Sequence, residues 1–413
     1  MTLSSSPPAG GPERADELER RLRGRAQTVL TYTDATADPR PLVGLHEEVR
    51  AALGPTGPLA LLLEYNVEEL RSRTRSVAES ARVWAELHAR AEATLDRHDT
   101  TLMSIKALYA RYARLSGGPA DLDAAAQNYE VEWRRRLAIL GAKADRTSTA
   151  HANLAIALRD RGGRDDLRRA CEIAREEVQV RHAVWGADHS FTWIAQVILA
   201  QTLLTVAERA DPTEPDPDDS ITGDSSPGDS GTVDSPTPPG PGPGPVDADS
   251  WKSGHDRYPP VLGDDLARPR DELIAEGRAV AAAVLAARRE RFGATSDATL
   301  RTQLVYAHAL LLAGEPSQAA SEIRYVLATN RRVGANLDPG WPELLLARAL
   351  LAAVLSEEGD DLDGTLRDDA LRQARAAVEA RRGRYPAGAH RVAEAERFER
   401  EARRLAAQQT ADE

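Results

Sequence analysis

The sequence predicts an all-α fold in which helical hairpins stack in series as an α-solenoid. Composition is the first observation: 41% of the residues are apolar but only 4% are aromatic. Ala, Leu and Val must therefore fill the core, and the abundant Ala, Leu, Arg and Glu favour helix. The second observation is a recurrence of glycine and alanine at fixed spacing. The third is a Pro/Gly/Asp-rich stretch that interrupts this recurrence once.

The recurrence of small residues is the strongest signal. Four segments place a large apolar residue directly before an alanine, at Ala110, Ala155, Ala200 and Ala307. A glycine precedes each of the last three by 14 residues, at Gly141, Gly186 and Gly293, and a small residue follows all four by seven, at Gly117, Gly162, Ala207 and Gly314. Small residues let antiparallel helices approach closely, and glycine takes left-handed conformations that end helices. One hairpin cannot bury its apolar face alone, so we expect five or six hairpins to stack.

The elements follow in order along the chain. Residues 1–12 are Ser/Pro/Gly-rich and are predicted to be disordered. Residues 13–74 are predicted to form an N-terminal helical region, with helices at 13–33, 42–53 and 58–71. Helical repeats are expected over 75–210, starting with a helix at 75–95, and over 266–407, where a weaker copy (Ala349, Gly359 and Ala370) precedes a C-terminal helix.

The segment 211–265 is predicted to be a disordered acidic insert. It contains alternating Pro and Gly at 238–245 and many Asp and Ser residues, which bury too little apolar surface to fold. The spacing of the small residues places this insert between the two helices of one repeat, expected at 190–209 and 268–292. The alternative, a linker between two domains, leaves each of these helices without a partner.

One stretch of the repeats resembles a known family. Arg181 to His189, with Gly186-Ala-Asp-His189, followed by Gln196 to Ala200, is similar to the kinesin-light-chain type of tetratricopeptide repeat (TPR). Asn153-Leu154-Ala155 matches the Asn-Leu-Ala of that type's first helix. The resemblance covers about 75–400, and actinobacteria carry many such repeats. It implies a right-handed superhelix whose first helices line a concave groove for partner segments. Three extra residues in several units, the insert and a diffuse last unit depart from the pattern.

Charge and cysteine content narrow the function classes. The net charge is −12, and residues 211–250 carry ten acidic and no basic side chains, so the rest of the chain is near −2. This balance gives no argument for binding nucleic acid or an anionic membrane. Cys171 is the only cysteine, which excludes an intrachain disulfide and a cysteine metal cage. With no signal peptide and no expected membrane span, the predicted location is cytoplasmic.

The sequence contains no motif for phosphate binding, zinc-protease chemistry or serine-hydrolase chemistry. We therefore predict no catalytic residues, no cofactor, no metal site and no enzymatic activity. Two weak alternatives remain: His182 and His189 as a metal pair, and Cys171 as a reactive thiol near arginines. The plainer interpretations are a helix start at His189 and a packing role for Cys171. Arginine clusters at 134–136 and 159–169 suit phosphates, but interleaved acidic residues favour a solvated face.

The expected groove supplies the candidate binding residues. If the aligned alanines pack each hairpin, the next residue and the fourth after it face the groove. The predicted partner-binding residues are Arg111, Arg114, Asn153, Arg159, Gln201 and His308, with apolar Ile156, Leu204 and Leu311 at the remaining positions. The Lys/Asn pair with which some TPR proteins clamp a peptide carboxylate is missing. The arginines instead suit an acidic partner segment; the alternative is that they only solvate the surface.

These observations predict a protein–protein interaction scaffold that binds a partner protein or peptide. One rival is a regulatory or sensor subunit of a bacterial signalling or defence system, and another is a helical-repeat nucleic-acid binder. A further hypothesis is that the acidic insert covers the arginine-bearing groove and competes with partners, in a manner that salt would screen.

Overall fold

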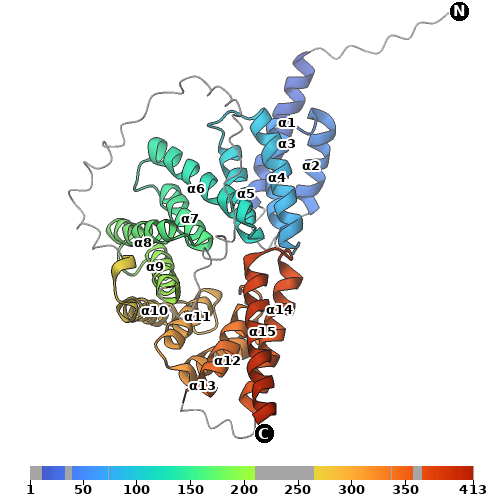
Figure 1. Cartoon of the computed structure of the whole chain (residues 1–413). Coiled ribbons are helices and arrows are strands. Elements are labelled where there is room, and N and C mark those ends of the chain that lie inside the picture. The colour runs from blue at the N-terminus through green and yellow to red at the C-terminus, as the bar shows by residue number, and fades with distance from the viewer. Residues whose placement is uncertain are drawn as a thin grey trace, which may run out of the picture. The chain divides into compact units, whose positions relative to one another are not determined.

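The computed structural model describes residues 12–32, 40–72, 74–209, 265–335, 337–356 and 365–412, and all statements below concern these residues. They contain fifteen α-helices, one short 3-10 turn and no strand (Figure 1). The predicted all-α class is confirmed. The predicted disordered segment 1–11, most of the predicted insert (210–264) and Gly359 lie outside the described residues.

The described residues form two compact units. Unit 1 comprises residues 1–161, 338–347 and 360–413, and unit 2 comprises 162–337 and 348–359. The helices of unit 1 are α1 (Pro12–Tyr32), α2 (Arg40–Leu53), α3 (Pro58–Arg71), α4 (Val77–Thr94), α5 (Thr100–Ser116), α6 (Pro119–Leu140), α7 (Asp145–Arg161), α14 (Thr365–Arg384) and α15 (His390–Asp412). Those of unit 2 are α8 (Arg164–Trp185), α9 (Ser190–Arg209), α10 (Arg270–Phe292), α11 (Asp297–Leu312) and α12 (Pro316–Val333), and α13 (Trp341–Leu355) has residues in both.

Helices that follow one another in the chain pack against one another within each unit. In unit 1 this holds from α1 through α7 and again for α14 with α15, and in unit 2 from α8 through α12. We call α5, α7, α9 and α11 the first helices of their repeats and α6, α8, α10 and α12 the second helices. Each aligned alanine of the first helices is buried, with at most 1% of its surface exposed (Ala110, Ala155, Ala200 and Ala307). This serial packing confirms the predicted solenoid class.

The glycines that end three of the second helices, α6, α8 and α10, have nearly the same backbone conformation. Gly141, Gly186 and Gly293 end α6, α8 and α10 with nearly the same backbone angles, φ 78°, 90° and 80° and ψ 166°, 169° and 163°. Positive φ is as predicted, but ψ lies far from the left-handed helical value expected for these three, in a region that is nearly exclusive to glycine. Gly117 does take the left-handed helical conformation, with φ 73° and ψ 12°. The two turn types therefore differ in geometry.

Three of the second helices, α6, α8 and α10, and also α14 carry an arginine near their C-terminal ends. Each of these arginines donates a hydrogen bond to the backbone carbonyl ten residues later, from Arg136 to Arg146, Arg181 to Phe191, Arg288 to Ala298 and, in α14, Arg381 to Arg391. The recipient carbonyl lies at the start of the next first helix. The contact therefore fixes the second helix of one repeat to the first helix of the next.

Unit 1 contains helices from both terminal parts of the sequence. Val77 of α4 packs with Tyr385, Ala389 and Val392, which surround the start of α15. The backbone N–H of His390 donates to the carbonyl of Gly117 at 3.3 Å. A Cβ on Gly117 would come within 2.7 Å of His390 Nδ1, so only glycine fits there. The start of α15 is thereby seated on α4 and on the end of α5.

In unit 2, α9 and α10 pack directly against each other although residues 210–264 separate them in the chain. This agrees with the predicted position of the insert between two helices of one repeat. The chain is held on both sides of this segment. Arg209 donates to the carbonyl of Gly162, and Asp265 is 4% exposed within a 3-10 turn, η3 (Asp265–Ala267), that lies on α8. Asp265, which we had included in the disordered insert, is therefore an ordered and buried residue.

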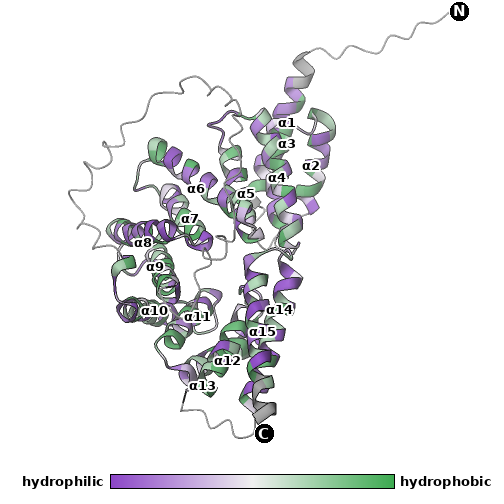
Figure 2. Ribbon diagram, viewed as in Figure 1, coloured by the Kyte–Doolittle hydropathy of each residue, from purple (hydrophilic) through white to green (hydrophobic). Residues whose placement is uncertain are grey.

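Helix α9 is the one described helix that is long and apolar enough to cross a membrane, a feature that the sequence reading overlooked. Its most apolar stretch is 61% buried inside the protein. Figure 2 shows hydrophobic residues along α9 and hydrophilic ones along its neighbour α8. Because α9 packs between α8, α10 and α11, its apolarity is that of a core helix.

Candidate functional site

The first helices carry all six residues that the sequence nominated for partner binding. Arg111 and Arg114 lie on α5, Asn153 and Arg159 on α7, Gln201 on α9 and His308 on α11. Arg111 is exposed, with its guanidinium 5.9 Å from the ring centroid of Tyr112, and the other five are half-buried. Unit 1 brings two of the predicted arginines together, and unit 2 pairs His308 with a carboxylate.

The centre of the unit 1 site is Asp160, at the end of α7. Arg114 Nη1 donates to its Oδ2 at 2.5 Å, Arg159 Nη2 lies 3.2 Å from its Oδ1, and Arg391 Nη2 lies 3.4 Å from its Oδ2. These three arginines come from α5, α7 and α15, and their side chains are only 13% to 15% exposed. One carboxylate therefore joins three helices of unit 1.

The electrostatics of this site favour the charged form of Asp160. Burial alone would raise the pKa of Asp160, but Arg114, Arg159 and Arg391 outweigh it and hold that pKa well below its usual range. Burial lowers the pKa of Arg159, and Asp160 opposes this. Arg391 also pairs with Asp338, which accepts a hydrogen bond from Tyr385. Within this cluster, three guanidinium groups thus face the two carboxylates of Asp160 and Asp338.

Next to this cluster, Arg111 adds a positive charge that is accessible to solvent, one turn before Arg114 on α5. Both arginines lie close enough to Tyr129 of α6 to oppose the rise in the pKa of that phenol, which is caused mainly by burial. Arg111 is the member of this group that a solvent-borne carboxylate reaches first, because the other arginines are mostly covered. The arrangement is suited to charge-assisted hydrogen bonds with an acidic group.

Unit 2 has its own ion cluster around Glu208 of α9. Arg348 of α13 pairs with this carboxylate, and His308 Nε2 lies 3.6 Å from its Oε2. Burial would raise the pKa of Glu208, but Arg348 and His308 lower it well below its usual value. The predicted His308 therefore faces an internal carboxylate of its own unit. Gln201 lies on the same helix, two turns before Glu208, and is also engaged in contacts.

Four residues of these clusters were missed from the sequence. Asp160 directly follows the nominated Arg159, but it stands five residues after the packing alanine, outside the positions considered. Arg348 follows Ala347, which repeats the pattern of a large apolar residue before an alanine, whereas the sequence reading aligned Ala349. Glu208 and Arg391 carry no local signal, because their partners are 140 and 231 residues away in the chain.

The arginine clusters considered for phosphate binding are largely paired within the protein. Arg134 binds Glu130 and Arg136 binds Glu132, each at 2.6 Å, and Arg136 also donates to the carbonyl of Arg146. Arg168 binds Asp165 at 2.6 Å. These contacts support the interpretation as a solvated face, since intrahelical carboxylates already neutralise the positive charge.

The structure bears on the two alternative sites, a metal pair of His182 and His189 and a reactive thiol at Cys171. His189 Nδ1 accepts a hydrogen bond from the backbone N–H of Phe191 at the start of α9, as expected for a helix start. The described residues contain no group of three or more His, Cys, Asp or Glu that could hold a metal ion. Cys171 is buried, and burial together with Asp265 raises the pKa of its thiol to about 12. A thiol in this environment stays protonated and is a poor nucleophile.

The helix pairs, joined in series with matching glycine turns, form a helical-repeat fold of the α-solenoid class. No protein-family model matches the chain, and no curated protein matches it. Among solved structures, the repeats of a putative kinesin light chain from Podosopora anserina are 12% identical, with a TM-score of 0.40, over 68% of this chain and 97% of that one. BtubC (BKLC) from P. vanneervenii is 12% identical, with a TM-score of 0.38, over 79% and 93%. At these TM-scores the likenesses carry no argument about binding or function.

Proposed function

We propose that this TPR-like protein is a non-enzymatic interaction scaffold that binds an acidic segment of a partner protein on the first helices α5 and α7 of unit 1. One observation carries the proposal: Arg111 is exposed on α5, one turn from a buried cluster in which three arginines face two carboxylates. The exposed guanidinium of Arg111 attracts an incoming carboxylate, and the mostly covered surroundings of the cluster strengthen that attraction.

The surrounding packing supports a recognition role. Small alanines fill the contacts between helices, and the exposed Arg111 is not needed to build the core. Arg114 and Arg159 are held in place by Asp160, which limits the side-chain entropy that a partner would otherwise have to remove. We therefore propose binding rather than catalysis. The proposed location is the cytoplasm.

The test uses the full-length chain and two charge-reversal variants. Arg111→Glu removes the accessible cation, and Arg134→Glu makes the same change at a residue of the second helix α6 whose side chain is 69% exposed. Proteins captured by the wild-type chain are identified by mass spectrometry, and the affinity of a purified candidate is then measured by calorimetry at several salt concentrations.

We expect Arg111→Glu to weaken binding about tenfold or more, through loss of one charge-assisted contact and addition of repulsion. Arg134→Glu is expected to leave affinity nearly unchanged, and wild-type affinity is expected to fall as salt rises. A partner that binds both variants equally well, or whose binding ignores salt, would contradict the proposal.

A further inference from the structure

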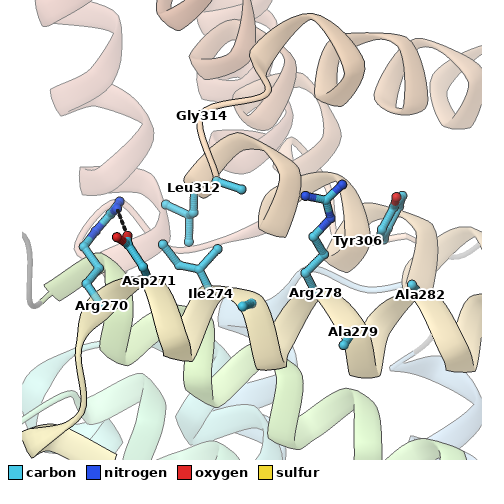
Figure 3. Close-up of a pocket in the computed structure, with 11 residues that line it drawn as sticks. Arg270, Asp271, Ile274, Arg278, Ala279, Ala282, Tyr306, Leu312 and Gly314 are labelled. Atoms are coloured by element: carbon cyan, nitrogen blue, oxygen red, sulfur yellow. Dashed lines mark ion pairs between the residues drawn. The ribbon is translucent and has the colours of Figure 1, made fainter.

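A groove of about 600 Å³ lies beside the second helix α10 in unit 2. Its floor is mostly apolar, with Ile274, Ala279 and Ala282 of α10 and Leu312 at the end of α11. Figure 3 shows Arg278 and Tyr306 standing together at one side of it and Arg270 paired with Asp271 at the other. The groove therefore combines a small apolar floor with cationic edges.

The same face of the preceding second helix, α8, is covered by the chain itself. Gly186 and Gly293 end α8 and α10 with matching backbone angles, so positions counted back from these glycines are equivalent. Fifteen residues back are Cys171 and Arg278, and eleven residues back are Arg175 and Ala282. Cys171 and Arg175 lie beneath η3, whereas Arg278 and Ala282 line the groove.

The contacts of η3 show how such a face holds an acidic segment. Arg175 donates from Nε and Nη2 to the two carboxylate oxygens of Asp265, both at 2.8 Å. From its other edge, Nη1 and Nη2 bind Glu276 of α10 at 2.8 and 2.9 Å. One guanidinium thus binds a carboxylate from the neighbouring second helix and another from the short segment that lies on top.

Like Arg175, Arg278 binds a carboxylate from the neighbouring second helix, here Glu315 at the start of α12. Its Nη1 and Nη2 donate to the two oxygens of Glu315, at the start of α12, at 2.5 and 3.0 Å. This is the same edge with which Arg175 binds Glu276. Glu315 uses only two of the five N–H donors of this guanidinium, and Tyr306, which stands beside Arg278 in the groove (Figure 3), also interacts with it. Arg278 is therefore set to bind one more carboxylate.

The face of α8 is covered by η3 and the face of α10 is not, because the connections that follow α9 and α11 differ in length. Between α9 and α10 the chain is long, and its last residues form η3 on α8. Between α11 and α12 only residues 313–315 intervene, so the turn has no segment to lay over α10. We propose that the α10 groove binds a short segment of a partner protein in which an acidic residue stands next to an apolar one.

The occupant follows from the chemistry of the groove. The acidic residue would bind Arg278 in the manner of Asp265 on Arg175, and the adjacent apolar side chain would lie on Ile274 and Ala279. Leu266 beside Asp265 supplies the same pair of features within this chain. The site is separate from the Asp160 cluster, so its failure would leave the proposed function untouched.

The test uses the δ1 methyl resonance of Ile274 in the full-length protein, assigned with Ile274→Val. The probe is the synthetic peptide Gly-Asp-Asp-Leu-Ala-Arg, which is the sequence of residues 263–268. We expect a saturable shift of this methyl signal at millimolar peptide. Replacing both Asp residues of the peptide by Asn, or Arg278 by Gln, is expected to weaken binding about tenfold or more.

Arg289→Gln is the matched control, because Arg289 is on the same helix, outside the groove. It should leave the titration unchanged. No Ile274 shift, or one that ignores Arg278→Gln, would overturn the proposal. So would a shift caused by Trp251→Ala or Tyr258→Ala without peptide, which would identify the chain's own segment as the occupant, or a shift on dilution, which would identify a second copy.

Discussion

At the scale of single residues, Asp160 is the carboxylate that holds together the buried arginine cluster of unit 1. Its side chain is 8% exposed and contacts arginines from three helices. Removing one member of a buried ion cluster lowers the stability of the protein more than replacing the whole cluster by apolar residues, because the remaining buried charges are left uncompensated. The contribution of Asp160 to stability therefore depends on pH.

We expect Asp160→Asn to destabilise the protein by about 3 kcal/mol at pH 7. The folded-state pKa of Asp160 is depressed, so its contribution is present above the unfolded value near 3.9 and is lost as pH falls below it. Urea unfolding at pH 7 and at about pH 2.5 checks both points, and the variant should lose less stability on acidification than the wild type. Asp165→Asn, at a 93% exposed side chain paired with Arg168, is the control and should change stability by under about 0.5 kcal/mol.

Gly186 tests the turn geometry apart from packing. An added Cβ would meet no atom within 4 Å, so any penalty for Gly186→Ala comes from its φ of 90° and ψ of 169°. We expect a loss of about 1–3 kcal/mol. Gly44→Ala, inside α2 and equally open, should instead stabilise by about 0.5–1 kcal/mol. Equal effects of the two substitutions in thermal melts would show that the turn conformation is not required.

At the scale of helices, the arginine-to-carbonyl contact is the recurring link between repeats. Arg181 and Arg288 make this contact at equivalent positions, five residues before Gly186 and Gly293, but their other partners differ. Arg181 also binds buried Glu177 at 3.1 Å, whereas Arg288 donates to the Thr302 hydroxyl at 2.7 Å. Burial lowers the pKa of Arg288 to about 10, which indicates that its charge is poorly compensated.

Methionine at these two positions should therefore differ in effect. Arg181→Met leaves Glu177 buried without its nearest cation and is expected to destabilise by about 3 kcal/mol, whereas Arg288→Met should have a smaller effect, about 1 kcal/mol. Adding Glu177→Gln to Arg181→Met should restore part of the loss. Urea denaturation of the three variants measures this, and no recovery in the double variant would assign the effect to the carbonyl contact alone.

The helices themselves were predictable because their ends are marked locally. The predicted 190–209 coincides with α9, and the predicted 58–71 coincides with α3, where Pro58 starts the helix. The binding side chains were predictable only in part. Arg114 and Arg159 follow from repeat spacing, but Arg391 joins Asp160 from 231 residues away, and no local pattern encodes such a pairing. The η3 turn was missed because three residues next to a Pro/Gly-rich stretch carry no periodicity.

At the scale of the whole molecule, the long connection between α9 and α10 is attached at two fixed points. Arg209 is bonded to Gly162 on one side, and Asp265 is clamped by Arg175 on the other. One point lies just before the start of α8 and the other on α8 itself, so both belong to unit 2.

Replacing residues 211–262 by a Gly/Ser linker of about 12 residues should leave the melting temperature unchanged or slightly raised. Loop closure depends weakly on length, and two halvings of the loop are worth about 1 kcal/mol. Calorimetry of the full chain and the variant checks this, and a marked drop would mean that the removed residues pack on the repeats. The same variant tests competition: if the acidic stretch shields the arginines, partner affinity at low salt should rise.

The seating of α15 on α4 and α5 has a consequence for biosynthesis. A ribosome delivers Val77 more than 300 residues before Tyr385, Ala389 and Val392. The apolar surface of α4 around Val77 therefore stays uncovered while the residues between them emerge. Helices α9 to α12 each pack against the helix just before them in unit 2, so we expect this stretch to fold before the contact of α4 with α15 forms.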